Sequence, residues 1–379
     1  MPESAGRRRS QATVVALLTV MVLSMAAPAV AAPIQIPVGP GVVGEPPEVT
    51  AATYLLYDES LDMVLVSDGM DIERPMASTT KVMTALLVLE NTDPDDIVTV
   101  TADAAIRRGS IIPLYAGEQL TVRQLLLALL VRSGNDAARA LAAHVSGDVP
   151  TFVTLMNERA RELGMTHTSF RNPNGLDVDG HYSSARDLLI VDRAAMEHPL
   201  YREIIATKGA VLPEDPYGHV RFLRQTNSLV REDFEGALGG KTGDTPNADK
   251  TFVGAAERDG RRLYVVVMGS DDHMADAAAL FEHGFKDYPV FAAIAAGGRY
   301  AVHRAGDTET GVSAAGDLTT VGVDGADVTV APSIEDGEPV LVASAGEQVL
   351  GSVSVDTEPA PPLPGLGDAV GWLAGLFDR

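Results

Sequence analysis

The 379 residues are enough for one large domain or two ordinary ones, and 46% of them are apolar, which supports a sizeable core. The formal net charge is −23 and no basic cluster follows residue 10, which argues against nucleic acid as a partner because phosphate contacts need clustered lysine and arginine. The chain has no cysteine, so disulfides, thiolate metal sites and cysteine redox chemistry are excluded.

Residues 1–32 have the layout of a secretory signal peptide. Three consecutive arginines (7–9) precede an uncharged apolar run, and small residues follow it. We therefore predict an exported protein that is cleaved near Ala31 or Ala32. An uncleaved membrane anchor is the alternative, because the apolar run comes close to the length that spans a bilayer. Residues 33–47 are rich in proline and glycine and are predicted to form a linker.

Residues 48–295 combine strand and helix patterns and are predicted to form one large domain. Strand patterns at Thr53–Asp58 and Asp62–Ser67 flank a short polar turn and predict a hairpin. Helix patterns then cover Thr79–Glu90, Val122–Ser133, Asp136–Val145, Phe152–Leu163 and Ser184–Glu197. Strand patterns return at Thr251–Glu257 and Arg262–Ser270. This order predicts an α+β domain whose first and last strands share one antiparallel sheet, with helices packed on its faces.

The pattern changes after residue 295. Short valine-rich runs alternate with glycine and aspartate turns, so residues 296–357 are predicted to form a small all-β domain. Residues 358–379 combine a stiff proline-rich spacer with a tail whose apolar residues share one helical face. The tail is too short to span a bilayer and lacks a basic face, so peripheral membrane contact and a frayed end both stay open.

Ser78 and Lys81 lie one turn apart at the start of a predicted helix. Backbone N–H groups at a helix N-terminus and the positive end of its dipole favour developing negative charge. The lysine, three residues on, lies on the same helical face. One interpretation is therefore a serine nucleophile beside its own base. The alternative is an N-cap serine followed by a lysine that reaches solvent.

Two further short motifs are candidates for chemistry. Ser133 and Asn135 flank a glycine at a break between two helix patterns, where helix capping is the ordinary explanation. Lys241, Thr242 and Gly243 follow two glycines, and glycine lets a backbone approach a ligand closely. These three residues are candidates for binding a substrate carboxylate. A flexible surface loop is the alternative.

Together the motifs occur once each in the order Ser-x-x-Lys, Ser-x-Asn, Lys-Thr-Gly, which is the signature of penicillin-binding proteins and class A β-lactamases. With these motifs and the stretches NPNGLD and YSSARDL, the chain resembles the serine D-alanyl-D-alanine carboxypeptidases of peptidase S11 type, the low-molecular-mass penicillin-binding proteins. The resemblance runs from about Glu48 to Val355. It implies a β-lactamase/transpeptidase-like domain, with a five-stranded antiparallel sheet and a helical cluster, followed by a small β domain.

The resemblance also implies an activity. The enzyme would remove the terminal D-alanine from peptidoglycan stem pentapeptides through an acyl-enzyme on Ser78, and β-lactam antibiotics would inhibit it. Lys81 would be the base, because burial and the charge of Lys241 would both lower its pKa. Ser133 would relay a proton to the leaving amine, and Asn135 would orient Lys81 and the substrate amide.

The substrate carboxylate would bind Lys241 and Thr242, and the backbone N–H groups of Ser78 and Asp244 would form the oxyanion hole. Asp244 is a departure from the family pattern, because histidine or tyrosine is expected at this position in many relatives. A carboxylate here should repel the substrate carboxylate unless it points away or meets Arg262.

Three other functions remain as alternatives. A class A β-lactamase needs a glutamate after the second motif, and the corresponding stretch TSFRNPNGLD has none. A catalytically weak wall-binding protein would take up penicillin without releasing D-alanine. A transpeptidase would use an amine acceptor instead of water. No cofactor is expected, and no metal site is predicted, because His144, His167, His181 and the other histidines show no close pair at ligand spacing.

Overall fold

The protein is described by a computed structural model that covers residues 46–105, 108–294, 299–305, 308–321, 328–335, 338–345 and 348–357. The predicted signal peptide (1–32), nearly all of the predicted linker and the C-terminal tail (358–379) lie outside the described residues. No helix in the described ranges combines the length and the apolar character that a membrane span requires.

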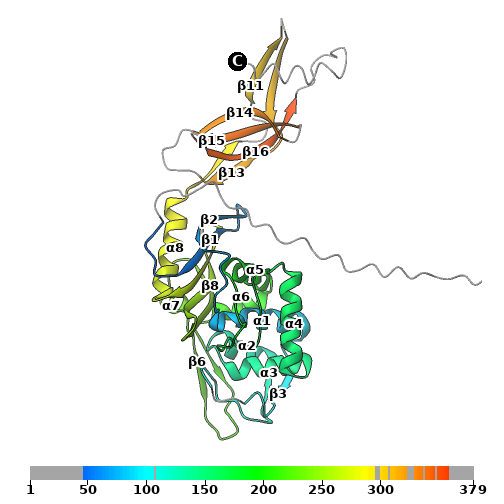
Figure 1. The fold of residues 1–379 in the computed structure, drawn as a ribbon, viewed down its shortest axis with the longest axis vertical. Coiled ribbons are helices and arrows are strands. Elements are labelled where there is room, and N and C mark those ends of the chain that lie inside the picture. The colour runs from blue at the N-terminus through cyan, green and yellow to red at the C-terminus, as the bar shows by residue number, and fades with distance from the viewer. Residues whose placement is uncertain are drawn as a thin grey trace, which may run out of the picture. The chain divides into compact units, whose positions relative to one another are not determined.

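A five-stranded antiparallel sheet forms the centre of the first part of the chain (Figure 1), with the strand order β2-β1-β9-β8-β7. The strands are β1 (Thr53–Asp58), β2 (Met63–Asp68), β7 (Ala237–Thr245), β8 (Asp249–Arg258) and β9 (Arg261–Ser270). The first hairpin joins the later strands through β1, in which Thr53 pairs with Met268 and Asp58 with Leu263 of β9. This confirms the predicted α+β class and the sharing of one sheet by its first and last strands.

The two faces of the sheet are both buried, because alternate residues of each strand point to opposite sides. In β1, Leu55 and Tyr57 belong to the core that contains the helical cluster, whereas Tyr54 and Leu56 belong to the core beneath α8 (His273–Asp287). Figure 1 shows α8 and the helical cluster on opposite sides of the sheet. Burial on both faces explains why the strand segments carry apolar residues at consecutive positions.

The helical cluster packs on the face opposite α8 and carries the first two motifs. Its helices are α1 (Lys81–Asn91), α2 (Val122–Leu130), α3 (Asn135–Ser146), α4 (Val149–Glu162), α5 (Ala185–Met196) and α6 (Pro199–Ile205). Shorter elements between them are β3 (Ile97–Thr99), β4 (Gln119–Thr121), β5 (Gly209–Leu212), β6 (Arg221–Arg224) and the single turn α7 (Ser228–Arg231). Helix α2 ends at Leu130, three residues before the predicted end, so Ser133 lies in the turn between α2 and α3.

Two elements differ from the expectations. The Lys-Thr-Gly segment is not a flexible loop but part of the edge strand β7. Helix α8 is not apparent from the sequence pattern, because polar residues and Gly284 interrupt its apolar positions. A Cβ at Gly284 would lie 2.7 Å from Leu263 Cδ1, so the glycine allows α8 to lie close against the sheet.

From residue 290 onward, the elements of the described residues are all strands. These are β10 (Val290–Ile294), β11 (Arg299–Ala305), β12 (Thr308–Ala314), β13 (Leu318–Val321), β14 (Val328–Glu335), β15 (Glu338–Ala345) and β16 (Gln348–Thr357). One sheet has the order β11-β12-β16-β15-β14, and β10 pairs with β13. They bury a small core of their own, formed by Ile294, Ala314, Leu341, Ala343 and Leu350.

Candidate active site

Ser78 lies in a single 3-10 turn, Ala77–Thr80, that leads directly into α1. The serine does not cap α1, so the capping alternative does not describe this turn. Ala77 has a φ of +46°, a left-handed conformation that an L-residue rarely adopts and that the surroundings must enforce. Thr80 Oγ1 donates to the Ala77 carbonyl at 2.8 Å, and Thr251 Oγ1 of β8 donates to the Met76 carbonyl at 3.1 Å. The turn is therefore tied both to its own helix and to the sheet.

Lys81 is the first residue of α1, and its side chain is fully buried instead of reaching solvent. Its Nζ donates to Ser78 Oγ at 2.7 Å, to Asn135 Oδ1 at 2.8 Å and to the backbone carbonyl of Asn174. Burial lowers the pKa of Lys81 well below its ordinary value, and the charge of Lys241 adds to this effect. The structure thus brings together the predicted nucleophile, the predicted base and the asparagine of the second motif.

Ser133 and Asn135 stand on either side of Gly134, which is the N-cap residue of α3. Asn135 is the first residue of α3, and its Nδ2 donates to the Arg108 carbonyl at 3.0 Å. Ser133 is 6% exposed and has a φ of +64°. Among the described residues, no hydrogen bond joins its hydroxyl to Ser78 or Lys81. The structure therefore brings Asn135 into direct contact with the lysine and leaves Ser133 in a strained turn beside it.

The third motif lies on β7, whose central residues are buried even though it is an edge strand. Lys241 is fully buried, its Nζ donates to the Thr242 carbonyl at 2.6 Å, and burial lowers its pKa to about 7. Thr242 Oγ1 donates to Thr226 Oγ1 at 2.8 Å, which orients the threonine side chain.

Gly243 brings β7 against the nucleophile turn. A Cβ on this glycine would lie 2.8 Å from Ser78 N and 2.8 Å from Ala77 Cβ, and closer still to Thr251 Oγ1. No larger residue fits without displacing one of these groups. The backbone of the Lys-Thr-Gly segment is therefore in direct contact with the backbone of Ser78, which is the arrangement that an oxyanion hole made from both segments requires.

Asp244 is exposed and lies opposite Lys250 in the β7–β8 ladder. It does not meet Arg262, because that guanidinium contacts Glu59 and Glu257, each at 2.9 Å. The carboxylate of Asp244 is therefore not neutralised by Arg262. Because it is exposed, solvent screens its charge instead.

Two contributors to the site are not evident from the sequence. The Asn174 carbonyl accepts from Lys81, and a backbone acceptor has no side-chain signature. His181 accepts from the Arg171 backbone N–H through Nδ1 at 3.0 Å and contacts Thr80 Oγ1 through Nε2 at 2.8 Å. Burial lowers the pKa of His181 to about 4, so its ring is neutral and its single proton is on Nε2, directed at Thr80. His181 is therefore a buried structural support of the Ser78 turn.

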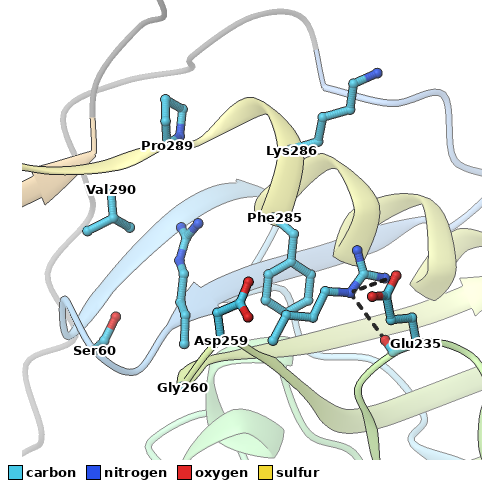
Figure 2. A pocket seen from close by; sticks show the side chains of 10 residues that line it. Ser60, Glu235, Asp259, Gly260, Phe285, Lys286, Pro289 and Val290 are labelled. Atoms are coloured by element: carbon cyan, nitrogen blue, oxygen red, sulfur yellow. Dashed lines mark hydrogen bonds and ion pairs between the residues drawn. The ribbon is translucent and has the colours of Figure 1, made fainter.

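A cavity of about 550 Å³ lies elsewhere, at the turn between β8 and β9 beside the end of α8 (Figure 2). Both of its arginines are paired with carboxylates, since Arg258 contacts Glu282 and Glu235, and Arg261 contacts Asp58. None of its lining residues belongs to the three motifs. Within the described part of the chain, no group of three histidine, aspartate or glutamate side chains is placed to hold a metal ion.

An antiparallel sheet covered by helices, with a buried lysine hydrogen-bonded to a serine hydroxyl and a Lys-Thr-Gly strand beside it, is the arrangement of the serine peptidases that carry the Ser-x-x-Lys, Ser-x-Asn and Lys-Thr-Gly motifs. A family model described as D-alanyl-D-alanine carboxypeptidase matches residues 41–272, and the chain belongs to this family. The resemblance seen in the sequence is thereby confirmed.

Individual relatives agree with this assignment. The chain is 40% identical over 249 residues to the D-alanyl-D-alanine carboxypeptidase DacB2 of Mycobacterium tuberculosis, covering 63% of this chain and 84% of that protein. It spans 63% and 60% of the length of two other curated relatives. Penicillin binding protein 5 from Haemophilus influenzae has a TM-score of 0.68 at 27% identity, covering 83% of this chain and 98% of that one. A Streptomyces K15 DD-transpeptidase has a TM-score of 0.60 at 31% identity, covering 63% and 99%.

Proposed function

We propose that this protein removes the terminal D-alanine from peptidoglycan stem pentapeptides and that Ser78 carries the acyl intermediate. The observation that supports this most directly is the contact of 2.7 Å between Lys81 Nζ and Ser78 Oγ. A free serine hydroxyl is a poor nucleophile and needs an adjacent base. The lowered pKa of Lys81 favours the neutral amine that such a base requires.

In the proposed reaction, Lys81 takes the proton of Ser78 as its oxygen attacks the carbonyl between the two D-alanines. The oxyanion that forms accepts hydrogen bonds from the backbone N–H groups of Ser78 and Asp244. Collapse of the intermediate breaks the C–N bond, and the proton held by Lys81 passes through the Ser133 hydroxyl to the departing amine, which leaves Lys81 neutral again. Water then attacks the acyl-enzyme, passes a proton to Lys81 and releases the shortened peptide, while Ser78 regains its proton.

Substrate orientation is proposed to come from the third motif. Lys241 and Thr242 would bind the free C-terminal carboxylate, since a buried ammonium beside an oriented hydroxyl suits a carboxylate. Gly243 would keep this strand close enough to Ser78 for one peptide to reach both. β-Lactam antibiotics would acylate Ser78 by the same route and leave it slowly.

The test is the release of free D-alanine from a stem pentapeptide by the protein lacking residues 1–32, beside a Ser78→Ala variant. We expect release by the wild type alone, together with penicillin labelling of the wild type alone. Release by both forms would show that the nucleophile is misassigned. Labelling of the wild type without release would contradict the carboxypeptidase proposal and leave a catalytically weak wall-binding protein.

A transpeptidase is the second candidate, and the similarity to the Streptomyces K15 DD-transpeptidase favours keeping it. Both reactions pass through the same acyl-enzyme and differ only in the acceptor. Addition of a glycine-type amine acceptor to the D-alanine assay separates them, because a transpeptidase would convert the donor mainly into the amine adduct.

We also propose that the protein acts outside the cytoplasm, because its substrate class is found there and residues 1–32 have the layout of a signal peptide. Contact of the tail (358–379) with a membrane stays a prediction from its sequence. A vesicle co-sedimentation assay with and without these residues tests it, and equal sedimentation of the two forms would rule it out.

A further inference from the structure

A cavity of about 440 Å³ opens beside the candidate active site and is rich in arginine. Its lining residues are Arg108, Arg139, Arg171, Asn172, Asn174, Leu176, Asp177 and Val178. Three guanidinium groups converge here on a chain whose formal net charge is −23. Such a local excess of positive charge against the overall balance points to an anionic ligand group.

Two of the three arginines form no ion pair within the described ranges. Arg139 is paired with Asp103, but Arg108 and Arg171 are both exposed, and within the described ranges neither has an ion-pair partner. The cavity also contains the carboxylate of Asp177, which already accepts from Thr245 Oγ1 at 2.7 Å and from the Asn247 backbone N–H at 3.3 Å. The guanidinium groups therefore have donors left for a ligand, whereas the carboxylate is largely occupied.

The cavity is joined to the reacting groups through Asn135 and Asn174. Lys81 Nζ donates to both residues, and Asn135 in turn donates to the carbonyl of Arg108. Arg139 is one turn after Asn135 on the same face of α3. The cavity is therefore next to the reacting groups, since one asparagine side chain links Lys81 to the backbone of Arg108.

The cavity wall is preorganised. Asn172 Oδ1 accepts from Gly175 N at 2.6 Å, and Asn172 Nδ2 donates to the Leu176 carbonyl at 2.8 Å. Gly175, with a φ of +85°, packs directly on the Ala77 carbonyl, where any Cβ would collide. The loop that presents Arg171 and Asn174 is thus fixed against the nucleophile turn, so ligand binding does not have to order it.

We propose that Arg108 and Arg171 form a subsite for a free carboxylate on the side chain of the third stem-peptide residue. This residue is bonded directly to the penultimate D-alanine, whose carbonyl is cleaved, so its backbone lies about one residue of extended chain, roughly 3.3 Å, from that alanine. A diamino acid that ends in a carboxylate, such as diaminopimelate, fits a double-arginine site. A lysine side chain would bring an ammonium without the accompanying carboxylate against two guanidinium groups and be disfavoured. The inference rests on the proposed carboxypeptidase function and assigns its substrate preference.

The experiment compares two peptides that end in D-Ala-D-Ala and carry diaminopimelate at the third position, one with its side-chain carboxylate free and one with it amidated. We expect the wild type to prefer the free acid by about tenfold in kcat/KM, mostly through KM, since two partly exposed charge pairs are worth about this much. In the double variant Arg108→Gln/Arg171→Gln the ratio falls toward one. Arg161→Gln on α4 removes the same kind of charge outside the cavity and keeps the ratio. High salt reduces the preference, because the arginines are exposed.

Equal turnover of the two peptides by the wild type would overturn the subsite, and so would a preference that survives in the double variant. Calorimetry with the Ser78→Ala protein measures the affinity for both peptides. It gives the preference for the free acid over the amide without turnover. Failure to release D-alanine from either peptide would therefore contradict the proposed function, and the binding ratio would still decide for or against the subsite.

Discussion

Lys81 and Lys241 are both buried, and the charge of Lys241 disfavours protonation of Lys81. Burial lowers the pKa of Lys241 to about 7, and its remaining charge contributes to the lowered pKa of Lys81. A charged Lys241 suits a substrate carboxylate, and a neutral Lys81 suits proton abstraction. The two lysines therefore favour the protonation states that the proposed reaction uses, because like charges close together in a buried site cannot both persist.

Removal of the Lys241 charge should move the pH dependence of acylation. The acid limb reports the free enzyme's base, so activity rises with pH as Lys81 loses its proton. In Lys241→Gln, one cause of the lowered Lys81 pKa is absent, and the limb should shift to higher pH. The measurement is the rate of acylation by a β-lactam between pH 5 and 9. Lys250→Gln serves as the control, and an unmoved limb in Lys241→Gln would contradict the coupling.

Gly243→Ala should damage acylation far more than its size suggests. The added Cβ meets Ser78 N and Ala77 Cβ at 2.8 Å, so the strand or the nucleophile turn must shift. Loss of one oxyanion donor typically costs a factor of about 10² to 10³ in rate, and we expect a loss of this order in penicillin acylation. Gly316→Ala, where a Cβ meets nothing within 4 Å, should have no effect. A Gly243→Ala variant that folds and acylates normally would show that this close approach is dispensable.

The side chains of the site were largely predictable, because Ser78, Lys81 and Asn135 carry their chemistry in their residue types. The structure brings these three together as expected. The contribution of Asn174 was not predictable, since it comes from a backbone carbonyl whose position depends on the fold of a distant loop. Ser133 is the opposite case. Its residue type and motif predicted a role in proton transfer, but within the described part of the chain its hydroxyl makes no hydrogen bond to Lys81.

Among the elements, β7 shows most clearly where local sequence misleads. Glycines at positions 239, 240 and 243 weaken its strand propensity, so the segment suggests a loop. The structure uses them for close approach: a Cβ at Gly239 would lie 2.6 Å from the Ile205 carbonyl oxygen, and one at Gly240 would lie 2.6 Å from Gly254 Cα. Tertiary packing therefore decides this strand, whereas β1 and β9 were predictable because their apolar runs are themselves strand-forming.

Helices α5 and α6 are joined by a buried pair that should make stability depend on pH. Tyr201 donates its hydroxyl to Asp192 Oδ1 at 2.6 Å, and burial raises the pKa of Asp192 to about 7. Between about pH 4 and 7 the unfolded chain has lost this proton while the folded protein retains it, so stability falls as pH rises. By this pKa difference, ionisation of Asp192 lowers the free energy of unfolding at pH 8 by roughly 4 kcal/mol relative to acid pH.

Asp192→Asn should therefore flatten the pH dependence, which urea unfolding at pH 4 to 8 measures. The variant cannot ionise, so relative to the wild type its free energy of unfolding should improve as pH rises. Asp259→Asn, at an exposed turn, should follow the wild-type profile. Parallel profiles for Asp192→Asn and the wild type would mean that the carboxyl titrates alike in the folded and unfolded states.

At the scale of the whole molecule, the described residues contain separate apolar cores. Two flank the five-stranded sheet, and the third lies within the C-terminal strands and includes Leu341 and Ala343. Seven of the eight predicted site residues lie on elements of the part that contains the first two cores, and Ser133 lies in the turn between α2 and α3. We therefore expect that a protein ending at residue 289 retains penicillin acylation within about twofold, because the stability of a domain comes chiefly from its own core. Loss of acylation in a folded, truncated protein would show that the C-terminal strands support the site.

The three hydrogen bonds of Lys81 Nζ determine how the side chain is oriented when it loses its proton. An ammonium has three protons to give, and here the acceptors are Ser78 Oγ, Asn135 Oδ1 and the Asn174 carbonyl. A neutral amine has only two protons and one lone pair, so one of these bonds must reverse direction when the lysine is deprotonated. Only the Ser78 hydroxyl can become the donor, because the two carbonyl oxygens cannot donate a hydrogen bond. Deprotonation therefore directs the lone pair of Nζ at the hydroxyl of Ser78. The same step makes Lys81 a base and orients the proton of Ser78 toward it.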